Sequence, residues 1–214
     1  MRRLIVILFI LVANLGFGQQ DALFSQYAYN QYAINPAYAG SRNSFSGVLL
    51  HRSQWVGIKD APRIESFTVH SPLNNSSMAY GVNFASEGIG PFTNNTAGLS
   101  LAYHIKLRNS KLSFGLRGGL FQAIFDKNLL SFKEEDDVFN VGGKESTMIS
   151  NFDFGTYYYT KRFFICVSIT HLTNQRLIFS IYPSASNLFL TPHIYLHSGY
   201  VFDLSGKIKM KPTV

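Results

Sequence analysis

The sequence of 214 residues predicts an all-β fold, an antiparallel up-and-down transmembrane β-barrel with about eight to nine strands present. Three observations predict this fold. Apolar residues alternate with small or polar ones from Phe45 onward, and successive side chains of a strand point to opposite faces. Only 14% of the residues are charged, whereas a solvated surface carries about 25–35% charge. Several alternating segments reach the roughly 9–11 residues of a tilted strand that crosses a bilayer.

Residues 1–18 predict a secretory signal peptide. Met1-Arg2-Arg3 is positively charged, Leu4–Val12 is an unbroken apolar run, and small residues precede the polar Gln19-Gln20. This three-part order is typical of a secretory signal, and the run is shorter than the roughly 20 residues that a membrane-spanning helix needs. We therefore divide the chain into a signal peptide at 1–18, an N-terminal plug or turn segment at 19–43 and a β-barrel domain at 44–214.

The segment 19–43 has the features of a compact, irregular structure before the first strand. Asn35 precedes Pro36, and a residue before proline avoids helical angles. Gly40 tolerates the positive φ that other residues resist. Two interpretations stay open for this segment, namely packing at the periplasmic mouth of the barrel and docking of a partner.

The strands are predicted from the alternation itself. In the segment 78–85, for example, Met78, Tyr80 and Val82 share one face, with small residues between them. The predicted strands are Ser44–Trp55, Ile64–Ser71, Ser77–Ser86, Thr96–Lys106, Lys111–Phe125, Asn151–Thr160, Phe163–Thr170 and Thr191–Phe202, with a ninth that begins at Lys207. Short turns and longer loops alternate between them, as in a meander. The longest connection is Asp126–Ser150.

Two architectures produce such alternation. A soluble sandwich or small barrel buries the apolar face, whereas a transmembrane barrel turns it outward to lipid and lines its lumen with small and polar residues. The non-apolar positions here are rich in Gly, Ser and Ala rather than in Lys and Glu. Aromatic residues also lie near strand ends, as at Tyr103, Phe125 and Tyr157–Tyr159, where an interfacial girdle belongs. These features favour the membrane barrel.

The cysteine, histidine and acidic residues and the catalytic motifs searched for predict no enzyme activity, cofactor or metal site. The single cysteine, Cys166, makes no internal disulfide, and the net charge of +7 comes from spread residues rather than from a nucleic-acid-binding stripe. The sequence contains no nucleophile elbow, phosphate-binding loop or zinc-protease motif. His193 and His197 would share a strand face roughly 13 Å apart, too far to share a metal. The acidic run at 134–137 is expected to be a solvated loop.

An ordered set of motifs carries a family resemblance. The motifs are Phe24-Ser25-Gln26-Tyr27, then Ile34-Asn35-Pro36-Ala37-Tyr38-Ala39-Gly40, then Arg52-Ser53-Gln54-Trp55-Val56-Gly57, and Ala61-Pro62. Looser matches follow in order at Gly115–Gly118, Phe154–Thr160, Ser168–Leu172, Gly199-Tyr200 and Lys211-Pro212. This order resembles the PorP/SprF family of the type IX secretion system in Bacteroidota. The resemblance marks as partner-docking candidates Phe24, Ser25, Gln26, Tyr27, Asn35, Pro36, Ala37, Tyr38, Ala39, Gly40, Gln54, Trp55 and Gly57.

The resemblance implies a non-enzymatic component of the type IX secretion system in the cell outer membrane. Such a component would assist the export or surface attachment of large adhesins. Its partners would be the outer membrane, the secretion machinery and an adhesin substrate, with contacts through Phe24–Gly40 and Asp126–Ser150. The main alternative is an outer-membrane channel for small or hydrophobic solutes. A secreted soluble β-domain that binds a ligand and a barrel hydrolase are further alternatives.

The end of the sequence departs from the resemblance. Members of the family are typically about half as long again and continue past a Lys-Pro motif, whereas this sequence stops at Lys211-Pro212-Thr213-Val214. Unpaired strand edges are not tolerated in lipid. We therefore expect the C-terminal strands of a larger barrel to be missing, with closure of eight strands as a smaller barrel as the alternative.

Overall fold

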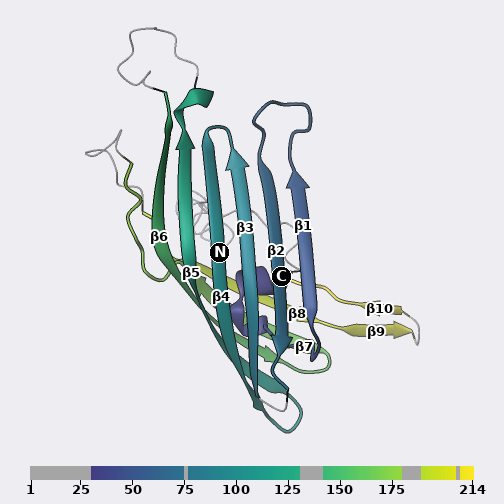
Figure 1. Cartoon of the computed structure of the whole chain (residues 1–214). Helices are drawn as coiled ribbons and strands as arrows, with labels where there is room; N and C mark the ends of the chain where they lie inside the picture. The colour runs from purple at the N-terminus through teal and green to yellow at the C-terminus, as the bar shows by residue number, and fades with distance from the viewer. Residues whose placement is uncertain (1–29, 75–76, 131–141, 180–188, 206–207) are drawn as a thin grey trace, which may run out of the picture.

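The computed structural model describes residues 30–74, 77–130, 142–179, 189–205 and 208–214. Eight strands form one antiparallel sheet in chain order (Figure 1). They are β1 (Ser46–Ser53), β2 (Arg63–Pro72), β3 (Met78–Ile89), β4 (Phe92–Lys106), β5 (Lys111–Asp126), β6 (Lys144–Tyr159), β7 (Phe163–Thr170) and β8 (His193–Tyr200). The smaller elements are α2 (Gln31–Ile34), η1 (Pro36–Tyr38), η2 (Lys127–Leu129), β9 (Phe202–Ser205) and β10 (Ile208–Met210).

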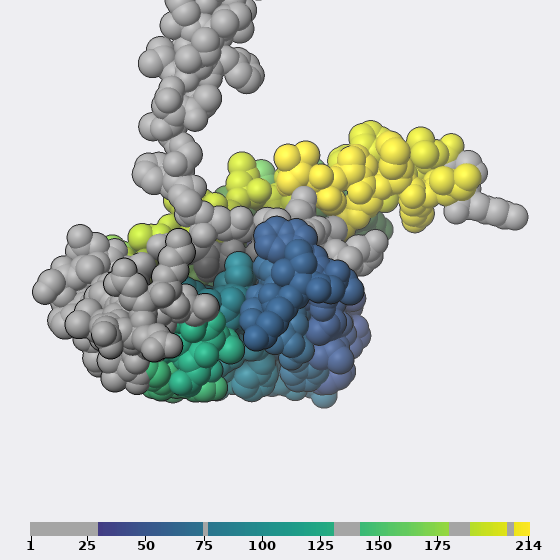
Figure 2. Space-filling model, turned by 90° about the horizontal axis from the view of Figure 1, so that it is seen from above, coloured from purple at the N-terminus to yellow at the C-terminus, as the bar shows by residue number. Residues whose placement is uncertain are grey.

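The sheet is a meander in which each strand pairs with the next along the chain. It curves, so that β7 and β8 pass behind the earlier strands in Figure 1, and the yellow C-terminal segments lie across from the blue strands in Figure 2. No pairing among the described residues joins β8 to β1. The all-β, antiparallel, up-and-down prediction is therefore confirmed, in the form of a half-barrel.

The two faces of the sheet carry opposite kinds of side chain. Along β4, Leu99 is 68% exposed on the outer face, whereas the next residue, Ser100, is 3% exposed on the inner face. Other exposed outer residues are Leu49, Phe67, Phe84, Leu101, Leu116, Leu120, Phe152, Ile194 and Leu196, and buried inner residues are Ser66, Thr68, His70, Asn83, His104, Ser113, Arg117, Asn151, Asp153, Ser168 and His197. Apolar residues outside and polar residues inside are the pattern of a membrane barrel.

The two ends of the sheet differ in their connections. Short connections at 73–77, 107–110 and 160–162 join the strands at what we call the turn end, and the first two lie at the bottom of Figure 1. At the opposite end, the loop end, the strands are joined by the longer connections at 54–62, 127–143 and 171–192 and by the short β3–β4 turn at 90–91. None of the helices in the described part of the chain is long and apolar enough to cross a membrane.

The strand bounds differ from the sequence prediction in two places. β6 begins at Lys144 rather than at Asn151, so the connection expected over Asp126–Ser150 is shorter. The missed part of β6 offers little alternation, since Ser146 and Ser150 stand where outer residues are usually apolar. The strand predicted at Thr191–Phe202 ends at Tyr200 as β8, and the following β9 pairs with β10 in a separate two-stranded ribbon.

Candidate functional site, a plug segment inside the half-barrel

Residues 30–40 form a compact segment that we call the plug. Asn35 has the extended backbone that the following proline requires, and its side-chain Oδ1 accepts a hydrogen bond of 2.9 Å from the Ala37 N–H. This bond caps η1, which begins at Pro36. The plug ends at Gly40, whose φ of 72° is in the left-handed region. The turn chemistry expected for this segment is therefore present.

The plug lies against the inner face of the sheet, and its backbone bonds to strand side chains. Ser113 Oγ donates to the Ala37 carbonyl at 2.8 Å, and His104 Nε2 donates to the Ala39 carbonyl at 2.8 Å. The Gly40 N–H donates to His70 Nδ1 at 3.2 Å. Ala37 and Ala39 are fully buried by these contacts. The polar inner face thus supplies the partners that a buried irregular backbone needs.

Two glycines on neighbouring strands let the plug approach the sheet closely. Gly115 of β5 pairs with Gly155 of β6 across the inner face. A Cβ atom at Gly115 would overlap the backbone of Ala37, and one at Gly155 would overlap the side chain of Asn35. Asn35 Nδ2 also donates to the Thr156 carbonyl at 3.0 Å. The Asn-Pro-Ala turn therefore fits a surface that only glycine leaves open.

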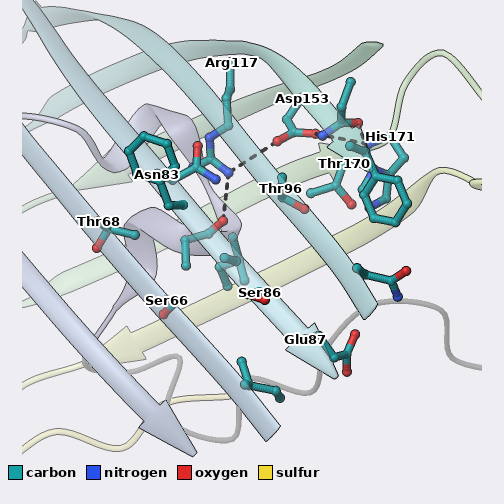
Figure 3. A pocket seen from close by; sticks show the side chains of 18 of the residues that line it. Ser66, Thr68, Asn83, Ser86, Glu87, Thr96, Arg117, Asp153, Thr170 and His171 are labelled. Atoms are coloured by element: carbon teal, nitrogen blue, oxygen red, sulfur yellow. Dashed lines mark hydrogen bonds and ion pairs between the residues drawn. The ribbon is translucent and has the colours of Figure 1, made fainter. Parts of the chain in front are cut away.

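Arg117 of β5 fixes the other half of the plug (Figure 3). Its Nη1 donates to the Ala33 carbonyl at 2.8 Å, and its Nη2 donates to the Tyr32 carbonyl. The guanidinium carbon lies 5.0 Å from the centroid of the Tyr32 ring, in cation–π geometry. Nη1 also forms an ion pair of 3.3 Å with Asp153 Oδ2 of β6, and both side chains are buried. One arginine thus joins the plug to two strands.

A hydrogen-bonded network holds Asp153 in place. Its Oδ1 accepts from Asn151 Nδ2 at 3.2 Å and from the His171 N–H at 3.1 Å. His171 Nδ1 donates to Asn151 Oδ1 at 2.8 Å. Both carboxylate oxygens therefore have donors, as a buried charge requires. Among the described residues, no group of three or more His, Cys, Asp or Glu side chains is placed to hold a metal ion.

A cavity of about 90 Å³ lies beside the plug, bounded by Ala33 and Ile34 on one side and by strands on the other. Figure 3 shows the side chains that line it, among them Ser66, Asn83 and Glu87. Its lining combines polar and apolar side chains. The cavity lies on the loop-end side of Arg117, and the plug residues Ala33 and Ile34 form part of its wall.

The structure separates the predicted site residues into two groups. Asn35, Pro36, Ala37, Tyr38, Ala39 and Gly40 lie together in the plug, and of these only Tyr38 is half-buried rather than buried. Gln54, Trp55 and Gly57 lie in the β1–β2 connection at the loop end, where Trp55 is 67% exposed. Phe24, Ser25, Gln26 and Tyr27 lie outside the described residues. Partner docking by any of them stays a prediction.

Sequence reasoning missed Arg117 and Asp153. Each is a charged residue at an inner position midway along its strand, and its nearest inner neighbours on that strand are small or uncharged. Charged groups on such a face are rare because they need buried partners. That signal was available in the sequence, but the partner of each charge follows only from the register that places Arg117 opposite Asp153.

Comparison with known proteins identifies the family. The model of the type IX secretion system membrane protein PorP/SprF matches residues 16–214. No curated protein and no solved structure matches the chain. The family match spans the plug, all eight strands of the half-barrel and the C-terminal ribbon. The chain belongs to the PorP/SprF family of type IX secretion system membrane proteins.

Proposed function

We propose that the chain is a non-enzymatic outer-membrane component of the type IX secretion system that assists the export or surface attachment of large adhesins. The observation that carries the proposal is the plug, whose backbone is bonded to β4 and β5 inside the half-barrel. A lumen filled in this way suits a scaffold that binds other proteins. The family supplies the secretion system in which that scaffold works.

The outer face supports placement in a membrane. Large apolar side chains such as Leu49, Leu99 and Leu196 are more than 60% exposed on it. Burying such residues in an apolar medium contributes about 1.5–3 kcal/mol each. The expected signal peptide would direct the chain out of the cytoplasm. In that compartment, the outer membrane is the apolar medium that receives β-barrels.

The plug counts against the alternative of a solute channel. An open channel needs a continuous aqueous path, and the plug lies inside the half-barrel, where it is bonded to Arg117 of the inner face. Displacing the plug would break the hydrogen bonds that Arg117, His104 and Ser113 donate to its backbone carbonyls, which is costly. The full chain reconstituted in a planar bilayer is therefore expected to show no steady conductance, and a steady ohmic conductance would favour the channel.

Deletion of the gene in the source cell tests the proposed function. Surface adhesins are measured by digestion of intact cells with an added protease and by detection of the same proteins in the culture medium. We expect the deleted strain to retain adhesins inside the cell or to release them, and the wild-type gene supplied in trans to restore surface display. Unchanged surface display in the deleted strain would contradict the proposal.

A further inference from the structure

The turn end of the half-barrel carries a concentration of positive charge. Its basic residues are Arg42, Lys106, Arg108, Lys111, Lys161, Arg162, Lys209 and Lys211. Asp203 is the one acidic side chain among the described residues there, and it pairs with Arg162 at 2.7 Å and Lys209 at 3.8 Å. No ion pair to a described carboxylate joins the other six. The turn end therefore presents a net positive surface.

The loop end is different, because acidic side chains there pair with some of the basic ones. Lys127 Nζ lies 2.7 Å from Glu145 Oε1, and Lys144 Nζ lies 2.9 Å from Asp126 Oδ2. The positive surface of the turn end is thus a local feature and not a consequence of the overall charge of +7.

The register places two of these lysines in an unfavourable position. Lys106 of β4 is directly opposite Lys111 of β5, at the last step of that hairpin. Like charges opposite each other destabilise a strand pair. The arrangement becomes favourable when an anion lies between or above the two ammonium groups. Negative charge bound at the turn end would relieve this local conflict.

Aromatic rings continue the same row across the inner face. Lys111 is opposite Tyr159 of β6, and Tyr159 is opposite Phe164 of β7. Lys111 Nζ lies 5.8 Å from the centroid of the Tyr159 ring, and Lys211 Nζ lies 4.7 Å from the centroid of the Phe164 ring. The mouth of the lumen therefore presents ammonium groups supported by ring faces.

A groove of about 1000 Å³ lies between the neighbouring β4–β5 and β6–β7 turns. Residues 106–111 form one wall and residues 159–162 form the other, so basic side chains stand on both sides of it. Lys111 Nζ also donates to Asn43 Oδ1 at 3.1 Å, which orients it from the segment that leads to β1. This groove has the size to receive an extended stretch of polypeptide.

We propose that the groove and the row of Lys106, Lys111, Tyr159 and Phe164 bind an acidic, extended segment of a partner protein. The side of the sheet on which these residues lie favours a protein over a lipid headgroup as the ligand. Lys106, Lys111 and Tyr159 have the same strand parity as the buried His104, Ser113 and Tyr157, so they belong to the lumen face. A lipid headgroup would meet the outer face, whereas a soluble polypeptide reaches the lumen mouth from the aqueous side. The proposal does not depend on the adhesin role.

The test measures binding of a fluorescein-labelled peptide of glutamates with one central tyrosine to the full chain in neutral detergent. Fluorescence anisotropy gives the affinity for the wild type and for Lys106→Gln/Lys111→Gln. We expect the double variant to bind about tenfold more weakly at low salt, and the wild type to lose most of its binding in about 1 M salt. A lysine counterpart of the peptide should not bind.

The matched control is Lys59→Gln/Lys144→Gln, which removes the same charge at the loop end and should leave the affinity within about twofold. A second test variant, Arg108→Gln/Lys161→Gln, changes only exposed turn residues, so a folding defect in the first variant does not decide the result. Resistance of the folded band to detergent before heating checks that each variant is folded. If the control variant lowers the affinity for the peptide as much as Lys106→Gln/Lys111→Gln does, the proposal is overturned, because the affinity then depends only on the net charge of the protein. Binding to anionic vesicles but not to the peptide would also overturn it and assign the lysines to lipid.

Discussion

The inner and outer faces of the same strands differ in what their side chains require. On the inner face, Ser113, Arg117 and Asp153 each make named hydrogen bonds to the plug or to one another. On the outer face, Leu99, Leu101 and Leu116 are exposed and need only an apolar medium. The residue type at an inner position therefore depends on the particular group to which it bonds. The residue type at an outer position depends only on the apolar medium around it.

This comparison explains how an irregular segment is held inside a sheet. Residues 30–40 are too short to build a core, and their backbone cannot complete a helix or a strand by itself. The strands supply hydroxyl, imidazole and guanidinium donors at the positions where the plug presents carbonyls. Side chains of the inner face thus satisfy the backbone carbonyls that the plug cannot satisfy by itself.

The largest effect is expected from Arg117→Ala, which removes a contact made only on the inner face. Asp153 would be left in a buried position without its cation, and the Ala33 carbonyl would lose its donor. The free energy of unfolding should fall by about 3–5 kcal/mol. Urea titration in lipid vesicles, followed by the band that resists detergent until heated, measures the change.

Two further variants make the Arg117 result specific. Arg108→Ala removes an arginine from an exposed turn and should change the free energy of unfolding by less than about 0.5 kcal/mol. Asp153→Ala combined with Arg117→Ala should recover part of the loss, because the buried carboxylate is then absent. Additive losses in the double variant would contradict an ion pair as the cause.

The second prediction concerns a substitution on the outer face. Leu99 lies midway along β4 and pairs with Val82 and Gly118, so Leu99→Arg places a charge in the middle of the lipid-facing surface. The expected loss is about 2–4 kcal/mol in a bilayer. Leu99→Phe keeps the surface apolar and serves as the control. A water-exposed surface would tolerate both changes within about 0.5 kcal/mol, and that outcome would contradict a lipid-facing sheet.

Much of this two-faced arrangement could be predicted from the sequence. Strand alternation is a property of the backbone, so Met78, Tyr80 and Val82 had to share a face wherever their partners lay. The turn at Asn35-Pro36 and the positive φ of Gly40 also follow from local chemistry. Local rules fail at the start of β6, because Lys144–Ser150 carries few apolar residues and its pairing with β5 gives it its structure.

The contacts of the plug could not be predicted in the same way. Arg117 lies 84 positions from Ala33 in the sequence and 36 positions from Asp153. Their contact depends on the register between β5 and β6 and on the curvature of the sheet. The same holds for Gly115 and Gly155, whose significance appears only when Asn35 and Ala37 are placed against them.

The third prediction compares an inner and an outer glycine of the same strand, β5. Gly115→Ala adds a methyl group on the inner face, where it would overlap the backbone of Ala37, and should cost about 1–3 kcal/mol through overpacking. Gly118→Ala adds the same group on the outer face, where its nearest neighbour is the Phe152 side chain. A cysteine placed at Ala37 in each background reports the plug position by its rate of labelling with a water-soluble maleimide. Equal labelling rates in the two variants would show that the plug does not press on Gly115.

The smallest effect concerns the pH dependence of the plug. Tyr32 OH is hydrogen-bonded to Ser100 Oγ at 2.5 Å, and burial raises the pKa of Tyr32 above its usual value. The folded state therefore favours the neutral phenol, so the stabilisation is complete below a pH of about 10 and decreases as the pH rises further. Tyr32→Phe should lose about 0.5–1.5 kcal/mol at neutral pH. The difference between variant and wild type should then narrow in alkaline solution, because the wild type alone must bury an ionising group at this position. Urea titrations of both proteins at neutral and alkaline pH measure the two differences, and a constant difference would mean that Tyr32 does not ionise in contact with the inner face.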